Sequence, residues 1–284
     1  MNGFIEILKV FVLGIIEGVT EWLPVSSTGH MILFDELVRL NMTPEFYEVF
    51  LVVIQLGAIA AVPILFFDKL WPFGKAKTKE DTSRILMLWL KVIVGVIPAG
   101  VLGILLDDLI DEILFDDAIK GIVVAAALII YGIAFIVIER LNKNKEATKL
   151  TVYDLSFKDA IFMGGFQVLS LVPGTSRSGS TILGGLIGGV SRTAASEFSF
   201  FMAIPVMLGA SLLKILKYFI SGFSPDPFEI ILLVLGMAVS FVVSLLAIKF
   251  LMNFVKTHSF AVFGYYRIIL GIIVLAYFVI RAFV

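Results

Sequence analysis

One motif occurs twice in this chain, as EGVTEWLPVSSTGHMIL at residues 17–33 and as QVLSLVPGTSRSGSTIL at residues 167–183. A shift of 150 positions places Ser26 on Ser176, and each of these serines is followed three residues later by a glycine. A Glu-Phe pair downstream of each copy repeats at nearly the same offset. Ordered matches at almost one offset indicate that the chain arose by duplication of one half.

The composition around the motif is that of a membrane protein. Of the 284 residues, 60% are hydrophobic and 16% are charged, far from the balance of an ordinary soluble domain. The apolar runs do not alternate with polar residues, so they favour helices that cross roughly 30 Å of hydrocarbon over the strands of a barrel. We therefore predict an all-α, polytopic membrane protein with about six full transmembrane helices. The predicted spans are residues 49–67, 85–106, 121–138, 198–220, 230–248 and 259–280.

The two motif regions do not fit simple crossings. Each consists of a short apolar segment, a break at Pro24 or at Pro173-Gly174, and a second apolar segment. At membrane depth such a break is tolerated only where protein or water surrounds the backbone. We therefore predict that each motif forms a re-entrant or broken helical hairpin.

The number of spans between the motifs predicts how the halves are related. Three full spans separate the two hairpins. An odd number of spans inverts the second half relative to the first, which gives an inverted-topology repeat. The broken segments of the two halves would then meet near the middle of the membrane. The halves are about residues 1–140 and 157–284, joined by a cytoplasmic connector at about 139–158 within one integral membrane domain of residues 1–284. If the motif segments were full crossings, the halves could instead be parallel.

Loop charges predict the orientation. Basic connectors at 68–84 and 139–158 are typical of the cytoplasmic side, whereas the connector at 107–118 has six acidic residues and no Lys or Arg, as an outside loop can. This places both termini and the first motif on the outer side. A net charge of −1 argues against a nucleic-acid partner, and the absence of cysteine excludes disulfides.

Two carboxylates stand in the first motif. Glu17 and Glu21 are four residues apart, which places them on one helical face. Ionisable groups within a membrane cost roughly 2.5 to 3.5 kcal/mol each on insertion scales, so a cluster of them indicates a function. Two close carboxylates are candidates for a general base or for ligands of a divalent ion such as Mg²⁺ or Ca²⁺. An acidic helix face satisfied by neighbouring donors is the alternative.

A hydroxyl-rich turn with a glycine occurs in both copies just before an apolar helix, where free backbone N–H groups bind anions. The first turn precedes His30, which could attack phosphorus or transfer a proton. The second contains Arg177, whose guanidinium suits phosphate recognition. Helix capping would select the same hydroxyls, and Arg177 could instead pair structurally with a carboxylate. The candidate residues of the turns are Ser26, Ser27, Thr28, Gly29, Thr175, Ser176, Ser178 and Gly179.

The patterns GxxEGxTEWLPVSSTGH and PGTSRSG resemble those of the undecaprenyl-diphosphate phosphatase family, the bacitracin-resistance type of integral membrane pyrophosphatase. The resemblance covers essentially the whole chain. It implies hydrolysis of undecaprenyl diphosphate in the bacterial plasma membrane, which recycles the lipid carrier of peptidoglycan synthesis, at a site open to the outer face. It also implies that the essential residues are Glu17, Glu21, His30 and Arg177, with Ser26, Ser27, Thr28, Ser176 and Ser178 around the phosphates.

Several points stay open at the level of sequence. The nucleophile is Ser27 deprotonated through Glu21, or His30, or a water molecule activated by Glu21. A divalent ion held by Glu17, and a homodimer, are both compatible with the chain, whose expected partners are the prenyl diphosphate lipid and membrane lipids. An inverted repeat with a midplane anion site is also the plan of secondary transporters and of a lipid-phosphate flippase. Local chemistry favours the enzyme, because a carrier has less use for paired carboxylates and a histidine beside a serine-rich turn.

Overall fold

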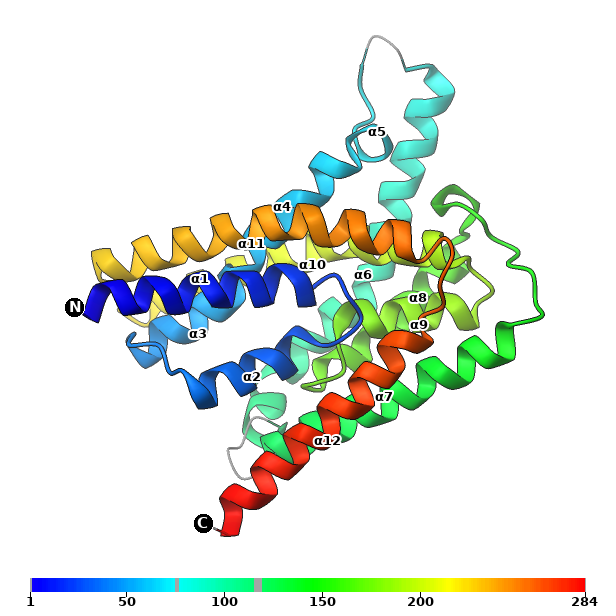
Figure 1. Cartoon of the computed structure of the whole chain (residues 1–284). Helices are drawn as coiled ribbons and strands as arrows, with labels where there is room; N and C mark the ends of the chain where they lie inside the picture. Colours follow the sequence, from blue (N-terminus) through cyan, green and yellow to red (C-terminus); the bar gives the residue numbers. More distant parts are fainter. Residues whose placement is uncertain (1, 75–76, 115–118, 284) are drawn as a thin grey trace.

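The computed structural model describes residues 2–74, 77–114 and 119–283, which form a bundle of helices (Figure 1). The helices are α1 (Asn2–Thr20), α2 (Ser27–Leu37), α3 (Pro44–Val53), α4 (Gln55–Leu65), α5 (Phe67–Leu70), α6 (Lys79–Leu114), α7 (Lys120–Asn142), α8 (Phe157–Val168), α9 (Arg177–Ile187), α10 (Arg192–Ile220), α11 (Pro227–Phe254) and α12 (Ala261–Phe283). Two 3-10 helices, η1 (Val152–Asp154) and η2 (Leu169–Leu171), flank α8.

Within the described residues, six segments are long and apolar enough to cross a membrane, which confirms the predicted class and number of spans. They are Pro44–Leu65, Lys79–Leu106, Lys120–Asn142, Arg192–Ile220, Pro227–Phe254 and Ala261–Arg281. The first of them is made of α3 and α4, which meet at Ile54. The backbone of α6 continues as helix to Leu114. The acidic side chains of the predicted outside loop at 107–118 lie outside the part that the structure describes.

Both motifs form a pair of helices joined by a turn. In the first copy α1 packs against α2, and in the second α8 packs against α9. The residue before the second helix of each pair has the same unusual backbone, with φ 73° at Ser26 and φ 72° at Ser176, and among the described residues only these two non-glycine residues have positive φ. Such a conformation costs of order 1–3 kcal/mol and persists only where its surroundings enforce it. The sequence repeat is therefore also a repeat of backbone geometry.

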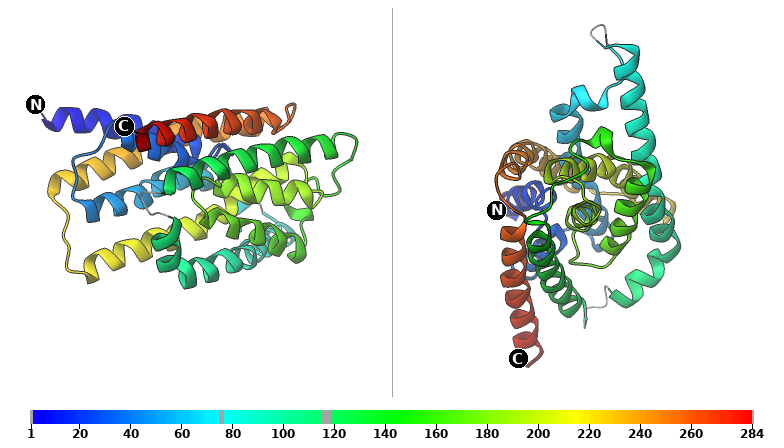
Figure 2. Two further views of the ribbon diagram at one scale, coloured as in Figure 1. Left: turned by 90° about the horizontal axis from the view of Figure 1, so that it is seen from below. Right: turned by 90° about the vertical axis from the view of Figure 1, so that its right-hand side faces the viewer.

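The packing of the helices pairs the two halves of the chain (Figures 1 and 2). Helix α1 lies along α11, its counterpart α8 packs against α6, and α7 and α12 pack side by side. The first helix of each motif therefore packs on a helix of the other half, and a two-fold relation between the halves predicts this exchange. The inversion of the second half in the membrane stays a prediction.

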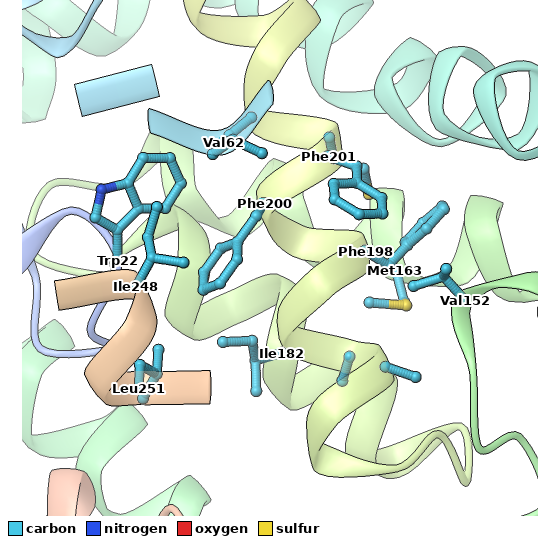
Figure 3. Packing of buried hydrophobic residues seen from close by; sticks show 14 of the residues in the cluster. Trp22, Val62, Val152, Met163, Ile182, Phe198, Phe200, Phe201, Ile248 and Leu251 are labelled. Carbon is cyan, nitrogen blue, oxygen red and sulfur yellow. The ribbon is translucent and has the colours of Figure 1, made fainter. Parts of the chain in front are cut away.

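A cluster of buried apolar side chains fixes the first motif to the second half (Figure 3). Trp22, directly after Glu21, is fully buried and meets the ring of Phe200 edge to face, with 5.1 Å between the ring centroids. Buried aromatic pairs of this geometry stabilise by about 0.5–1.5 kcal/mol beyond the area that they bury. The end of α1 is thereby held against α10, close to the start of α9.

The contact between α6 and α8 depends on glycine. A Cβ atom added at Gly164 would lie 1.9 Å from the carbonyl oxygen of Gly95, whereas one added at the neighbouring Gly165 would meet nothing within 4 Å. We expect Gly164→Ala to lower the melting temperature in detergent, because overpacking costs about 1–3 kcal/mol. Gly165→Ala is the matched control and should keep or raise it, because alanine favours a helix by about 1 kcal/mol over glycine. Equal melting temperatures for the two variants would contradict this packing.

Candidate active site

The carboxylate of Glu21 joins the two motifs. Its Oε2 accepts a hydrogen bond of 3.0 Å from the Ser27 hydroxyl, and its Oε1 accepts one of 3.1 Å from Nη2 of Arg177. The side chains of Arg177 and Glu21 are only 10% and 5% exposed, so little solvent screens the ion pair. Residues far apart in sequence thus meet, as predicted for the two broken helical hairpins. Arg177 pairs with a carboxylate, which is one of the two roles that the sequence allowed for it, and from the same position its guanidinium could also bind phosphate.

Arg177 is held in place from several directions by both terminal nitrogens and by the Trp22 ring. Nη1 donates a hydrogen bond of 2.8 Å to the carbonyl oxygen of Ser199, and the guanidinium carbon lies 6.0 Å from the centroid of the Trp22 ring. Its buried Nε–H group has no hydrogen-bond partner among the described residues. A buried donor without a partner is costly, so this group is suited to an anionic ligand.

Glu17 is buried one helical turn before Glu21. The backbone N–H of Glu21 donates to the carbonyl oxygen of Glu17 at 3.0 Å, which continues the helix and places the two carboxylates on one side, as their spacing predicted. The Oε1 atom of Glu17 has no hydrogen-bond partner in the described part of the chain. Burying an unpaired carboxylate oxygen is unfavourable unless a proton, a cation or a donor reaches it.

The serines before α2 and α9 both cap a helix. The hydroxyl oxygen of Ser26 accepts the N–H of Gly29 at 3.2 Å, and that of Ser176 accepts the N–H of Gly179 at 3.1 Å. These bonds satisfy donors that a helix N-terminus otherwise leaves free. Helix capping, one of the two interpretations that the sequence allowed, therefore accounts for these two hydroxyls in the structure.

The remaining hydroxyls of the turns differ in their surroundings. Ser178 is buried and its hydroxyl donates to the carbonyl oxygen of Glu21 at 3.0 Å, which is a second link between the motifs. Thr175 is also buried, and its hydroxyl has no partner among the described residues. Thr28 is half-buried beside Ser27 at the start of α2. The hydroxyl of Ser27 is the one that contacts a carboxylate.

His30 lies in the first turn of α2, half-buried. Its Nδ1 is 2.7 Å from the carbonyl oxygen of Ser26, and its Nε2 is 2.7 Å from the hydroxyl of Tyr266 on α12. The hydrogen bonds of the imidazole in the described structure thus go to these two groups instead of to Glu17 or Glu21. The sequence did not indicate Tyr266, which stands in the predicted span at 259–280.

Arg267 is a second residue that the sequence did not indicate. The side chain is fully buried, although it stands within the apolar run at 259–280. Nη1 donates to the carbonyl oxygen of Pro24 at 3.2 Å, and Nη2 donates to those of Gly174 and Thr175, each at 2.9 Å. One guanidinium therefore connects the breaks of both motifs. The charge of Arg267 could have indicated this role, because a cation in the middle of an apolar span needs polar partners within the protein.

Comparison with known proteins agrees with the motifs. Residues 10–273 match the family of the bacitracin resistance protein BacA. The chain is 54% identical over 277 residues to an undecaprenyl-diphosphatase of Enterococcus faecalis, an alignment that covers 96% of this chain and 97% of the relative. It is 53% identical to undecaprenyl-diphosphatase 1 of Clostridioides difficile (strain 630), with 97% of each chain covered. It is 50% identical to an undecaprenyl-diphosphatase of Desulfitobacterium hafniense (strain DSM 10664 / DCB-2), with 99% of each covered.

Proposed function

The chain belongs to the family of the bacitracin resistance protein BacA, and we propose on this basis that it hydrolyses undecaprenyl diphosphate to undecaprenyl phosphate and inorganic phosphate. Relatives of the same length are named undecaprenyl-diphosphatase. The observation that best supports this activity is that the Ser27 hydroxyl and the Arg177 guanidinium both donate hydrogen bonds to the buried carboxylate of Glu21. Ser27 is then the nucleophile, Glu21 is its base, and Arg177 is the cation that binds phosphate.

The geometry favours Ser27 as the nucleophile. Its hydroxyl already donates to Glu21, so the proton can pass to that carboxylate as Oγ attacks the terminal phosphorus. The bond from this phosphorus to the bridging oxygen breaks, and undecaprenyl phosphate leaves. Water then attacks the phosphoserine and releases inorganic phosphate. Phosphoryl transfer depends chiefly on positioning and on charge neutralisation, which Arg177 supplies.

A divalent ion is compatible with this site, but the described side chains do not form a complete set of metal ligands. Among the described residues there is no group of three or more His, Asp or Glu side chains that could hold a metal. Glu17 has an unpaired buried oxygen and lies one turn from Glu21, so these two carboxylates could bind Mg²⁺ or Ca²⁺ together with phosphate oxygens. Such an ion would neutralise charge on the diphosphate.

The orientation in the membrane is part of the proposal. The chain is a multi-pass membrane protein, and the basic connectors at 68–84 and 139–158 support a plasma membrane in which these loops face the cytoplasm. The first motif then enters from the outer side, and the diphosphate reaches the site from that face. The prenyl chain remains in the bilayer.

A phosphatase and a transporter of prenyl phosphates differ in whether the bond between the two phosphates of the lipid is broken. We expect the purified protein in detergent to release one phosphate from each undecaprenyl diphosphate, and Lys91→Ala, which removes a charge on α6 away from the motifs, to keep this rate. The measurement is phosphate release together with chromatography of the lipid product. Intact substrate, combined with exchange of prenyl phosphate across liposomes that contain the protein, would instead identify a transporter.

A further inference from the structure

The two ring nitrogens of His30 have different partners, and one of these partners fixes the tautomer. Nδ1 lies 2.7 Å from the backbone carbonyl oxygen of Ser26. A carbonyl oxygen can only accept, so the proton of the neutral imidazole must be on Nδ1. This leaves Nε2 as the nitrogen that accepts a hydrogen bond when the ring is neutral.

The hydroxyl of Tyr266 suits Nε2 in both protonation states of the imidazole. The two atoms are 2.7 Å apart, and the rings are almost parallel, with 7° between their planes. A tyrosine hydroxyl donates to the neutral imidazole and accepts from the imidazolium. A proton can therefore reach Nε2 while the ring keeps its position: the hydroxyl passes its own proton to Nε2 as its oxygen takes one from a water molecule, and the reverse sequence removes it.

Close packing of α12 holds Tyr266 in place. Two residues before it, a Cβ atom added at Gly264 would lie 2.7 Å from the carbonyl oxygen of Gly132 on α7, and one added at Gly132 would lie 2.7 Å from that of Gly264. The next residue after Tyr266 is the buried Arg267, which donates to both motif turns. Helix α12 is thus fixed on both sides of the tyrosine, and the hydroxyl has little freedom to leave the imidazole.

We propose that Tyr266 is a positioning residue, which holds the His30 imidazole so that proton transfer takes place at Nε2. Because the hydroxyl occupies the only lone pair of this nitrogen, attack of Nε2 on phosphorus would first have to break the hydrogen bond, whereas proton transfer through the hydroxyl would not. His30 then serves the reaction as an acid or a base, and Ser27 remains the nucleophile. The kinetic part of this inference rests on the proposed phosphatase activity, but the contact itself can be tested without it.

The kinetic test uses two neighbouring tyrosines. Tyr266→Phe removes the hydroxyl and keeps the ring, so we expect kcat to fall roughly 10-fold and KM to change less than about twofold, since general acid–base catalysis contributes typically 10²- to 10⁴-fold. Tyr265→Phe is the same change at the adjacent position, where the side chain is 55% exposed, and it should alter neither constant. A kcat for Tyr266→Phe within twofold of the unmodified protein would overturn the proposal.

The spectroscopic test needs no substrate. The chain has only two histidines, so protein labelled with ¹⁵N-histidine gives two imidazoles, and His258→Gln identifies which signals belong to His30. At a pH about two units above the usual imidazole pKa of about 6.5, Tyr266→Phe should move the Nε2 resonance of His30 toward that of a free acceptor nitrogen and leave Nδ1 protonated. Tyr265→Phe should move neither.

The two tests separate the contact from the activity. An unchanged Nε2 resonance in Tyr266→Phe would overturn the proposal even if turnover fell. If the unmodified protein released no phosphate, the proposed function would fail, and the resonance would still report whether Tyr266 holds His30.

Discussion

Replacement of Arg177 by lysine is expected to lower kcat/KM for undecaprenyl diphosphate by about 100- to 1000-fold, the loss typical of removing one donor that stabilises a transition state. The guanidinium uses Nη2 for Glu21 and Nη1 for Ser199, and its Nε–H has no partner in the described part of the chain. The three N–H donors of a lysine ammonium are all on one nitrogen atom, so they cannot reach the separate positions that the nitrogens of the planar guanidinium reach. Phosphate release by purified Arg177→Lys in detergent measures the effect.

The chain offers a matched control for this substitution. Arg192 also pairs with a buried carboxylate, because its Nε donates to Oε1 of Glu139 at 2.8 Å, but it lies at the start of α10 outside the two motifs. Arg192→Lys should therefore keep kcat/KM within about twofold, since exposed or partly exposed ion pairs contribute about 0–1 kcal/mol and none of its contacts reaches the site. Equal losses in both variants would mean that Arg177 acts only through stability.

Replacement of Arg267 by methionine is expected to lower both the stability and the turnover of the protein. The guanidinium donates to the carbonyl oxygens of Pro24, Gly174 and Thr175, and methionine would leave all three buried acceptors without this donor. Each buried group left unsatisfied costs about 1–3 kcal/mol. The melting temperature in detergent should fall by roughly 5 °C or more. Turnover per folded molecule should also fall, because the two turns lose their common anchor.

The comparison for this variant lies on the same helix. Arg281 is half-exposed near the end of α12 and pairs with Glu36. Arg281→Met removes an arginine from α12 away from the motif turns, and it should lower the melting temperature by much less than Arg267→Met does. If Arg267→Met melted and turned over like the unmodified protein, the buried guanidinium would not be what joins the two motifs.

The sequence predicted the polar residues that belong to the two copies of the motif. Glu21 and Arg177 could be assigned to one site because each lies in a copy of the motif, and the duplication implies that the copies meet. Six spans were predictable for a similar reason, since length and hydropathy decide whether a helix can cross a bilayer. The family followed from the same motif residues and is confirmed by the comparison.

Other parts of the site could not be predicted, for physical reasons. Tyr266 contacts His30 across 236 residues of sequence, and no pattern marks this pair. The charge of Arg267 in an apolar run signals that it needs partners, but nothing in the sequence shows that these are backbone carbonyls. The serines Ser26 and Ser176 could have capped helices or bound phosphate, because both roles select a hydroxyl. In the structure both hydroxyl oxygens accept the N–H of the glycine three residues later, which is the capping geometry, and phosphate binding by these serines stays a prediction.

We propose that Glu21 of the first motif and Arg177 of the second act in one site. The most direct test is a double-mutant cycle on kcat/KM for undecaprenyl diphosphate, with Glu21→Asp, Arg177→Lys and the combined variant. Residues in contact couple by about 0.5–3 kcal/mol, so the combined variant should lose clearly less than the product of the two single losses. Combining Arg177→Lys with the distant Lys91→Ala should give no coupling. A combined loss equal to the product of the single losses would contradict a shared site.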